Sequence, residues 1–187
     1  MPSTRDRLIE TTAELFRRQG YTGTGVKQIV EAAGAPFGSM YHHFPNGKED
    51  LGAHTIRWSG AIYGELIDLF YGSEPDVVAA TSRFFEGAAD TVRDTDYADA
   101  CPIATVALEV ASTNEPLREA TAEVFEAWLA ALDRHLEAGG VADPRPVSVA
   151  LFALLEGAFL LARATRDDSY VRTAGRAAAA VVGNAVG

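Results

Sequence analysis

The chain is poor in cysteine and lacks long apolar runs. Its one cysteine, Cys101, excludes an internal disulfide and favours a reducing, cytoplasmic setting. No uninterrupted apolar stretch reaches the ~20 residues that a membrane-spanning helix needs. Residues 1–10 are charged and polar and do not resemble a secretory signal peptide. From these absences we expect a cytoplasmic protein with no membrane partner.

Basic residues are also scarce, and the formal net charge is −10. Such a charge taken alone argues against nucleic-acid binding. Residues 1–57, however, hold seven Lys or Arg against six Asp or Glu, whereas residues 58–187 hold nine against twenty. Both lysines, Lys27 and Lys48, lie in the first segment, and chance is the alternative explanation. The distribution favours a chain of two parts, of which only the first tolerates a polyanion.

The sequence predicts an all-α fold. Strand-type alternation is absent, helical apolar periodicity dominates, and Pro and Gly separate the periodic segments. Expected N-caps include Ser3 or Thr4 for the first helix and Thr24 for the second, and Asn46 with Glu49 suggests a capping box. The nine expected helices cover about residues 3–19, 25–33, 37–43, 47–71, 75–93, 102–112, 115–138, 144–165 and 168–185.

Residues 24–51 have the pattern of a helix-turn-helix. Val26, Ile29 and Val30 give the first helix of this pair an apolar face, and Gly34 suits a turn with positive φ. In the short helix that follows, Met40 and Phe44 are four residues apart and therefore share the inward face. Its other side chains are left toward solvent or a partner.

Those outward side chains suit a DNA groove. Ser, His and Tyr donate hydrogen bonds to phosphates and base edges, and Gly38 permits close approach. Lys48 opens the next helix, where its ammonium and the helix N-terminus could meet one phosphate. We predict contacts to double-stranded DNA by Thr24, Lys27, Phe37, Gly38, Ser39, Tyr41, His42, His43 and Lys48.

The stretch ending in Tyr41, His42, His43 and Phe44, followed by Lys48 and Glu49, resembles the signature of the TetR family of repressors. The segment GAPFGSMYHHFPNGKEDL is similar to the sequences of the LmrA/YxaF-like branch, and so are residues 101–109 and 155–163. The resemblance implies a nine-helix TetR-type fold with a three-helix DNA-binding domain at 1–46 and an effector-binding and dimerisation domain at 47–187. The structural boundary between head and body is expected within the fourth helix. It also implies a homodimer through helices eight and nine, bound to a near-palindromic operator and released by a small-molecule effector.

Phe37 departs from this branch, which usually has a basic residue at that position. Phenylalanine cannot bond a phosphate or a guanine edge. It could contact a thymine methyl group, or it could pack on the DNA-binding head. Both interpretations remain open from the sequence.

The effector site is expected to be aromatic with a few polar groups. Thr105, Leu108 and Glu109 share one face of the sixth helix with Cys101, and that face mixes apolar and polar groups. A ligand-facing role and a structural role are equally favoured for Glu109, whereas pairing with Arg163 is the favoured role of Glu156. The predicted lining comprises Trp58, Ile62, Phe84, Thr105, Leu108, Glu109, Phe125, Trp128 and Phe159.

No motif supports catalysis, and no metal or cofactor is expected. The adjacent His42 and His43 point about 100° apart on a helix and would chelate a metal poorly. Gly-rich phosphate loops and nucleophile motifs are absent from the sequence. The predicted function is therefore a repressor that a lipophilic, aromatic effector removes from DNA. The alternative is a TetR-like activator or constitutive regulator without a ligand pocket.

Overall fold

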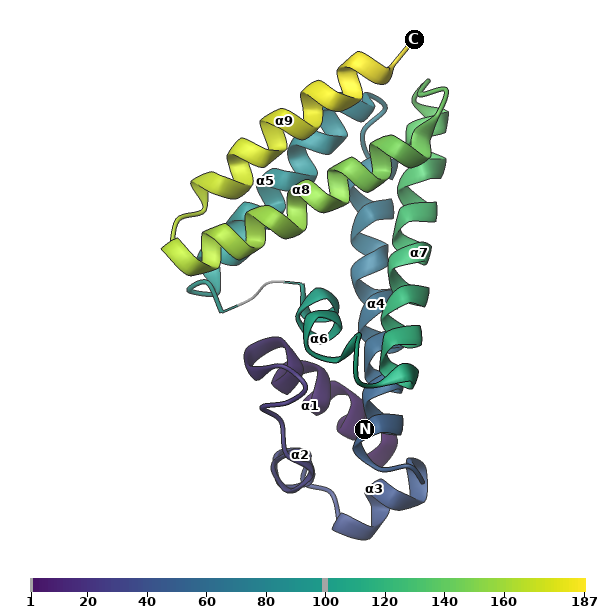
Figure 1. The fold of residues 1–187 in the computed structure, drawn as a ribbon, viewed down its shortest axis with the longest axis vertical. Coiled ribbons are helices and arrows are strands. Elements are labelled where there is room, and N and C mark those ends of the chain that lie inside the picture. The colour runs from purple at the N-terminus through teal and green to yellow at the C-terminus, as the bar shows by residue number, and fades with distance from the viewer. Residues whose placement is uncertain (1, 99–100) are drawn as a thin grey trace. The chain divides into compact units, whose positions relative to one another are not determined.

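The computed structural model describes residues 2–98 and 101–187. Over these residues the chain folds into nine α-helices and no β-strand, which confirms the all-α class (Figure 1). The helices are α1 (Thr4–Gln19), α2 (Val26–Ala32), α3 (Phe37–His43), α4 (Lys48–Gly72), α5 (Val77–Asp94), α6 (Pro102–Val110), α7 (Glu115–Ala138), α8 (Pro144–Thr165) and α9 (Ser169–Ala185).

The chain divides into two compact units, and α4 and α7 each run through both. Unit 1 comprises Met1–Ile62 and Cys101–Val124, and unit 2 comprises Tyr63–Ala100 and Phe125–Gly187. The division therefore falls inside α4. Unit 1 contains the predicted DNA-binding head together with α6. The sequence-based division at residue 46 separates roles rather than compact units, and it stays a prediction.

The helix-turn-helix of unit 1 is built around a small apolar core. At its start, the Ser3 hydroxyl accepts the Asp6 N–H, and the Asp6 carboxylate accepts the Ser3 N–H, which completes a capping box. Gly34 has a φ of 58° in the turn before α3, as its position predicts. The buried residues of this core are Leu8, Ile9, Ile29, Val30, Ala33, Met40, Phe44 and Leu51.

Unit 1 also depends on close approach between α4 and the first half of α7. A Cβ at Gly60 would lie 2.4 Å from a Val124 methyl group, and one at Gly52 would lie 3.0 Å from a Leu117 methyl group. Glycine at these points lets the α7 side chains touch the α4 backbone. The start of α4, which follows directly from the head, is thereby fixed within unit 1.

Unit 2 is a layered arrangement in which α9 lies along α5 and α8 (Figure 1). The contact between α9 and α5 is close because a Cβ at Gly175 would lie 2.6 Å from Phe85 Cβ. The core of this unit comprises Val77, Phe85, Ala89, Val92, Leu136, Val141, Val147, Leu151, Leu155, Ala158, Ala162, Val171, Ala174, Ala178 and Val182.

Several helix starts differ from the sequence expectation. Gly25, not Thr24, is the N-cap of α2, because the Thr24 hydroxyl donates to the Gly20 carbonyl oxygen at 2.7 Å. The N-cap of α5 is Asp76, whose carboxylate accepts the Val78 N–H at 2.9 Å. A competing hydrogen bond keeps Thr24 from capping α2, whereas the capping bond of Asp76 itself fixes the start of α5.

The expected capping box at the start of α4 involves Glu49. Its carboxylate accepts a hydrogen bond from Asn114 Nδ2 at 2.6 Å. The side chain thus links the start of α4 to the residue preceding α7, within unit 1. The local pattern that suggested the capping box could not predict this hydrogen bond, because Asn114 is 65 residues away from Glu49 in the sequence.

Among the described residues, α8 is the helix that combines great length with a strongly apolar composition. Its length and a window of mean hydropathy 1.8 would suffice to cross a membrane, and 33% of that window is buried. Polar residues interrupt its apolar stretch, so it contains no uninterrupted apolar run of spanning length. The same length and hydropathy occur in helices that pack inside globular proteins, and α8 packs against α9 on one side.

We expect Gly175→Ala to lower the stability of unit 2. An alanine is normally favoured over glycine inside a helix by ~0.5–1 kcal/mol. At Gly175 the new methyl would collide with Phe85 Cβ, an atom that no rotamer change can move away. Overpacking costs ~1–3 kcal/mol, so net destabilisation is expected in thermal unfolding at fixed protein concentration.

Gly183→Ala is the matched control on the same helix. Its Cβ would meet a Val78 methyl at 3.8 Å, an ordinary van der Waals distance. We therefore expect this variant to melt at or slightly above the temperature of the wild type. Equal melting temperatures for the two variants would contradict the packing described for α5 and α9.

Candidate DNA-binding and effector sites

Helix α3 presents its predicted DNA-contacting side chains outward. Phe37 and Tyr41 are 53% and 47% exposed, and Gly38 and His42 are exposed beside them. On the opposite side Met40 is fully buried and anchors the helix in the head core. A seven-residue helix is too short to be stable by itself. The burial of Met40 therefore stabilises α3 and also determines which face points outward.

The other residues predicted to contact DNA differ in how far they are exposed. Ser39 and His43 are half-buried, and the His43 ring contacts the His42 ring at 5.0 Å between centroids. Lys27, on α2, has an 83% exposed side chain and lies 3.8 Å from Glu31. An exposed ion pair of this length is weak, so Lys27 is available to a phosphate.

Thr24 lies inside the head, with 1% of its surface exposed. Its hydroxyl donates to the Gly20 carbonyl oxygen and accepts a hydrogen bond from Gln19 Nε2 at 3.3 Å. These bonds hold the loop between α1 and α2. Its contact with DNA stays a prediction, and its position in this structure gives it a structural role.

Lys48 is half-buried and bound to the same loop. Its ammonium donates to the Tyr21 carbonyl oxygen at 2.6 Å and lies 4.0 Å from the centre of the Tyr21 ring. Burial lowers the pKa of Lys48, and the nearby Glu109 carboxylate opposes that shift. An ammonium has three donors, so a phosphate contact is compatible with the bond to Tyr21. The sequence offered no signal for Tyr21, because the pair is 27 residues apart.

Glu109 is bound to the head rather than to an arginine. Its carboxylate accepts the backbone N–H of Thr22 at 2.7 Å. A Cβ at Gly20 would lie 1.9 Å from the same carboxylate, so only glycine at that position permits the contact. Both interactions lie within unit 1 and join α6 to the loop between α1 and α2. Effector binding by Glu109 stays a prediction.

The other predicted lining residues of unit 1 are differently placed. Leu108 is 86% exposed, and Trp58 and Ile62 on α4 are 38% and 43% exposed. The Thr105 hydroxyl donates to the Cys101 carbonyl oxygen at 3.0 Å. Cys101 is buried, and its sulfur caps α6 by accepting the Ala104 N–H.

The predicted aromatic residues of unit 2 form two ring clusters. Phe125 and Trp128 from α7 pack against Phe152 from α8, with ring centroids 5.6 to 6.0 Å apart. Phe84 from α5 packs at 5.7 Å against Phe70 and at 6.0 Å against Tyr71. Phe159 is partly buried against the core of the unit.

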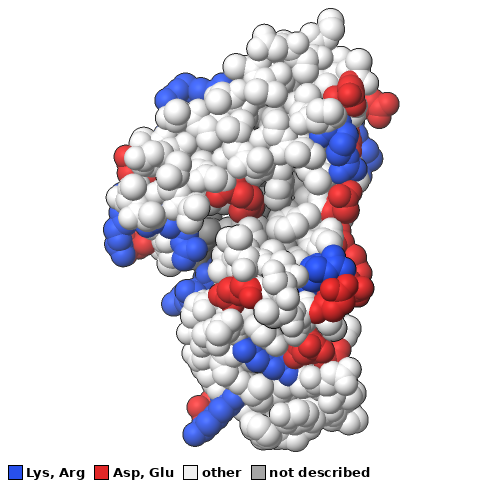
Figure 2. All heavy atoms as spheres, viewed as in Figure 1, with Lys and Arg blue, Asp and Glu red and all other residues white. Residues whose placement is uncertain are grey.

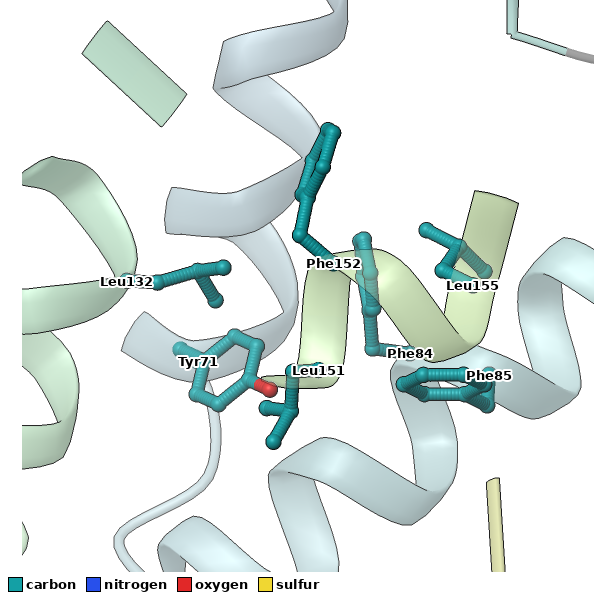
Figure 3. Close-up of a pocket in the computed structure, with 7 residues that line it drawn as sticks. All are labelled: Tyr71, Phe84, Phe85, Leu132, Leu151, Phe152 and Leu155. Atoms are coloured by element: carbon teal, nitrogen blue, oxygen red, sulfur yellow. The ribbon is translucent and has the colours of Figure 1, made fainter. Parts of the chain in front are cut away.

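A crevice joins the two clusters (Figure 3). It has no room for even one water molecule, whereas ligand sites usually begin at ~300 Å³. The one polar group that the close-up shows among the lining side chains is the Tyr71 hydroxyl, which lies 3.0 Å from the Thr81 hydroxyl. Burial raises the pKa of Tyr71 to about 12, so it remains a neutral phenol. The lining residues are Tyr71, Phe84, Phe85, Leu132, Leu151, Phe152 and Leu155.

The pairing of Glu156 with Arg163 stays a prediction. Arg163 Nε donates to the Tyr97 carbonyl oxygen at 3.3 Å. Tyr97 has a φ of 59° and lies just after α5. The guanidinium therefore supports a left-handed loop residue that no helical periodicity could have placed near it.

Comparison with known proteins agrees with this arrangement. The model described as "Transcriptional regulator LmrA/YxaF-like, C-terminal domain" matches residues 77–177. The model of "Bacterial regulatory proteins, tetR family" matches residues 8–54, which include α2 and α3. These families are transcriptional regulators and not enzymes.

Individual relatives cover most of the chain. The uncharacterized HTH-type regulator YxaF of Bacillus subtilis is 34% identical over 167 residues, which cover 88% of this chain and 87% of YxaF. The HTH-type regulator LmrA of the same organism is 29% identical over 167 residues, with coverage of 88% and 89%.

Among solved structures, reduced NemR of Escherichia coli superposes with a TM-score of 0.83 at 25% identity, covering 99% of this chain and 98% of NemR. A regulatory protein TetR from Rhodobacter sphaeroides gives 0.82 at 25% identity, covering 94% and 97%. The fold, the helix-turn-helix motif and the relatives thus all indicate the same family. The chain belongs to the TetR family of bacterial transcriptional regulators, with an LmrA/YxaF-like C-terminal domain.

Proposed function

We propose that this regulator is a cytoplasmic repressor that binds a near-palindromic operator as a homodimer. The outward face of α3, with Phe37, Gly38, Tyr41 and His42 exposed, is the observation that carries the proposal. A dimer would place two such helices in successive major grooves, about one helical turn apart. NemR, a relative 26% identical over 172 residues, is named a transcriptional repressor, which supports repression here.

The proposed dimer interface is the outer face of α8 and α9. Val149, Leu160 and Leu161 are 47%, 67% and 48% exposed on α8, and Tyr170 on α9 is 39% exposed. On α8, Val149 and Leu160 lie about three turns apart on one side, and Leu161 lies about 100° from Leu160 around the helix, so the exposed apolar face is broad. An exposed apolar surface of this kind marks an interaction site in a protein that is not in a membrane.

The proposed effector is a small lipophilic, aromatic compound that enters the crevice of unit 2. Aromatic rings from α4, α5 and α8 line it together with Leu132 of α7, and the Tyr71 hydroxyl offers one polar contact (Figure 3). Since the crevice is small, the effector must favour a more open state. It can release DNA only if it binds that state more tightly than the DNA-bound one.

The closed crevice also supports a second candidate function, that of a constitutive or activating regulator without a ligand pocket. Protection mapping on the DNA flanking the gene, followed by a screen of planar aromatic compounds for release, separates the two. The proposal expects a protected inverted repeat and at least one releasing compound. A protected site that no compound releases would favour the second function.

Leu132→Phe tests the crevice directly. The larger side chain would hinder the opening of the crevice to a ligand, so operator binding should survive while release requires about tenfold more compound. Leu69→Phe is the control, because Leu69 is 62% exposed on α4 and does not line the crevice. Equal release of both variants would place the effector elsewhere.

The two lysines should differ in what they contribute to DNA binding. Lys27→Ala should weaken operator and random DNA alike and reduce the slope of log affinity against log salt by about one unit. Its melting temperature should not change, because its side chain is 83% exposed.

Lys48→Ala should also lower the melting temperature, because its bond to the Tyr21 carbonyl oxygen is lost. Affinity measured from low to high salt, together with thermal unfolding, tests both variants. A Lys48→Ala protein with wild-type stability would show that the Tyr21 contact contributes nothing to the head.

Leu161→Glu should dissociate the dimer. In a two-fold interface each substitution enters twice, and two carboxylates would be buried without partners. We expect dimerisation to weaken at least a hundredfold in sedimentation equilibrium. The same change at Leu69 should leave the dimer intact, and a Leu161→Glu protein that stays dimeric would exclude this interface.

A further inference from the structure

The recognition helix carries an exposed aromatic pair at its beginning. Phe37 is the first residue of α3, and Tyr41 lies one turn later, so their side chains share a face. The ring centroids are 5.7 Å apart with planes inclined by 48°. About half of each residue is exposed, so the pair presents a joint apolar surface beside Gly38.

This surface has no charge to direct toward phosphates. Helix α3 contains no Lys, Arg, Asp or Glu, and the surface over it, at the bottom of Figure 2, is uncharged. Phe37 itself can neither donate nor accept a hydrogen bond. Among the groups that a DNA major groove offers, the thymine methyl is the one that an apolar side chain recognises.

Phe37 occupies the position in α3 from which a side chain reaches base edges when such a helix enters a major groove. First residues of a recognition helix are those that contact base edges. A Cβ at Gly38 would have no neighbour within 4 Å, so the next position leaves open space for the DNA. Met40 and Phe44, both fully buried, prevent the helix from rolling Phe37 inward.

We propose that Phe37, supported by the Tyr41 ring, contacts the methyl group of one thymine in each operator half-site. The inference rests on the proposed operator binding and names a specificity determinant within it. A phenylalanine here makes the regulator prefer a T·A pair at one position through an apolar contact. A G·C pair lacks the methyl group and loses the contact.

The size of the effect follows from the burial of a single methyl group. Removing one such group from an apolar contact should weaken binding about fourfold, and removing both symmetry-related groups about fifteenfold. The loss should be confined to the position that Phe37 contacts, and it should not alter the salt dependence, because no charge is involved.

The experiment substitutes the DNA rather than the protein. The full-length protein first selects its preferred sequence from a random duplex library. Each thymine of the selected half-site is then replaced by deoxyuridine, which lacks only the methyl group, and the Kd is measured by fluorescence anisotropy. The same duplexes are titrated with Phe37→Ala and with His42→Ala, an exposed polar position on the same helix.

We expect one thymine per half-site at which deoxyuridine weakens wild-type binding about fourfold. Phe37→Ala should show no further loss at that position, whereas His42→Ala should keep the full sensitivity. The wild-type measurement does not depend on whether a variant folds, and Phe37→Leu provides a second substitution that retains an apolar side chain.

Two results would overturn the inference while leaving operator binding intact. In the first, an operator is selected and bound but deoxyuridine weakens binding at no position. In the second, Phe37→Ala retains the sensitivity to deoxyuridine, which would assign the methyl contact to another residue. If the library yields no preferred sequence, the proposed operator binding fails as well. The selection step therefore separates failure of the inference from failure of the function.

Discussion

The burial of Met40 and Phe44 is the constraint on which the DNA-binding surface depends. Helix α3 has seven residues and no side-chain N-cap bond, so it cannot hold its conformation alone. The two fully buried side chains fix it to α1, α2 and the start of α4. Because they are four residues apart, they also set the rotation of the helix. The exposed face of Phe37, Gly38, Tyr41 and His42 is a consequence of that anchoring.

Much of this could be predicted from the sequence because its causes are local. The Ser3 cap, the turn at Gly34 and the spacing of Met40 and Phe44 follow from neighbouring residues, and the family signature lies in the same stretch. The exposed state of Phe37 does not follow from helical spacing, since residues three apart, such as Phe37 and the buried Met40, lie near one another on a helix. What the sequence left open was whether the ring packs on the head.

The parts that could not be predicted involve partners far apart in the chain. Lys48 bonds the carbonyl of Tyr21, and Glu109 bonds the N–H of Thr22 at a separation of 87 residues. Backbone groups of a loop carry no sequence signature, so no pattern identifies them as partners. Arg163 shows the same limit, because helical spacing gives no sign of its bond to the Tyr97 carbonyl oxygen, 66 residues away.

The contacts of Lys48 and Glu109 meet at one loop, and this gives the loop a role beyond connecting α1 to α2. Its Tyr21 carbonyl oxygen receives the ammonium at the start of α4, while its Thr22 N–H is held by a carboxylate of α6. The opposite charges of the two side chains also stabilise each other, since the carboxylate opposes the burial-driven fall in the lysine pKa. Hydrogen bonds weaken steeply when their geometry changes. A displacement of α6 would therefore move the loop through the bond from Thr22 to Glu109, and would strain the bond from Lys48 to Tyr21 at the start of α4.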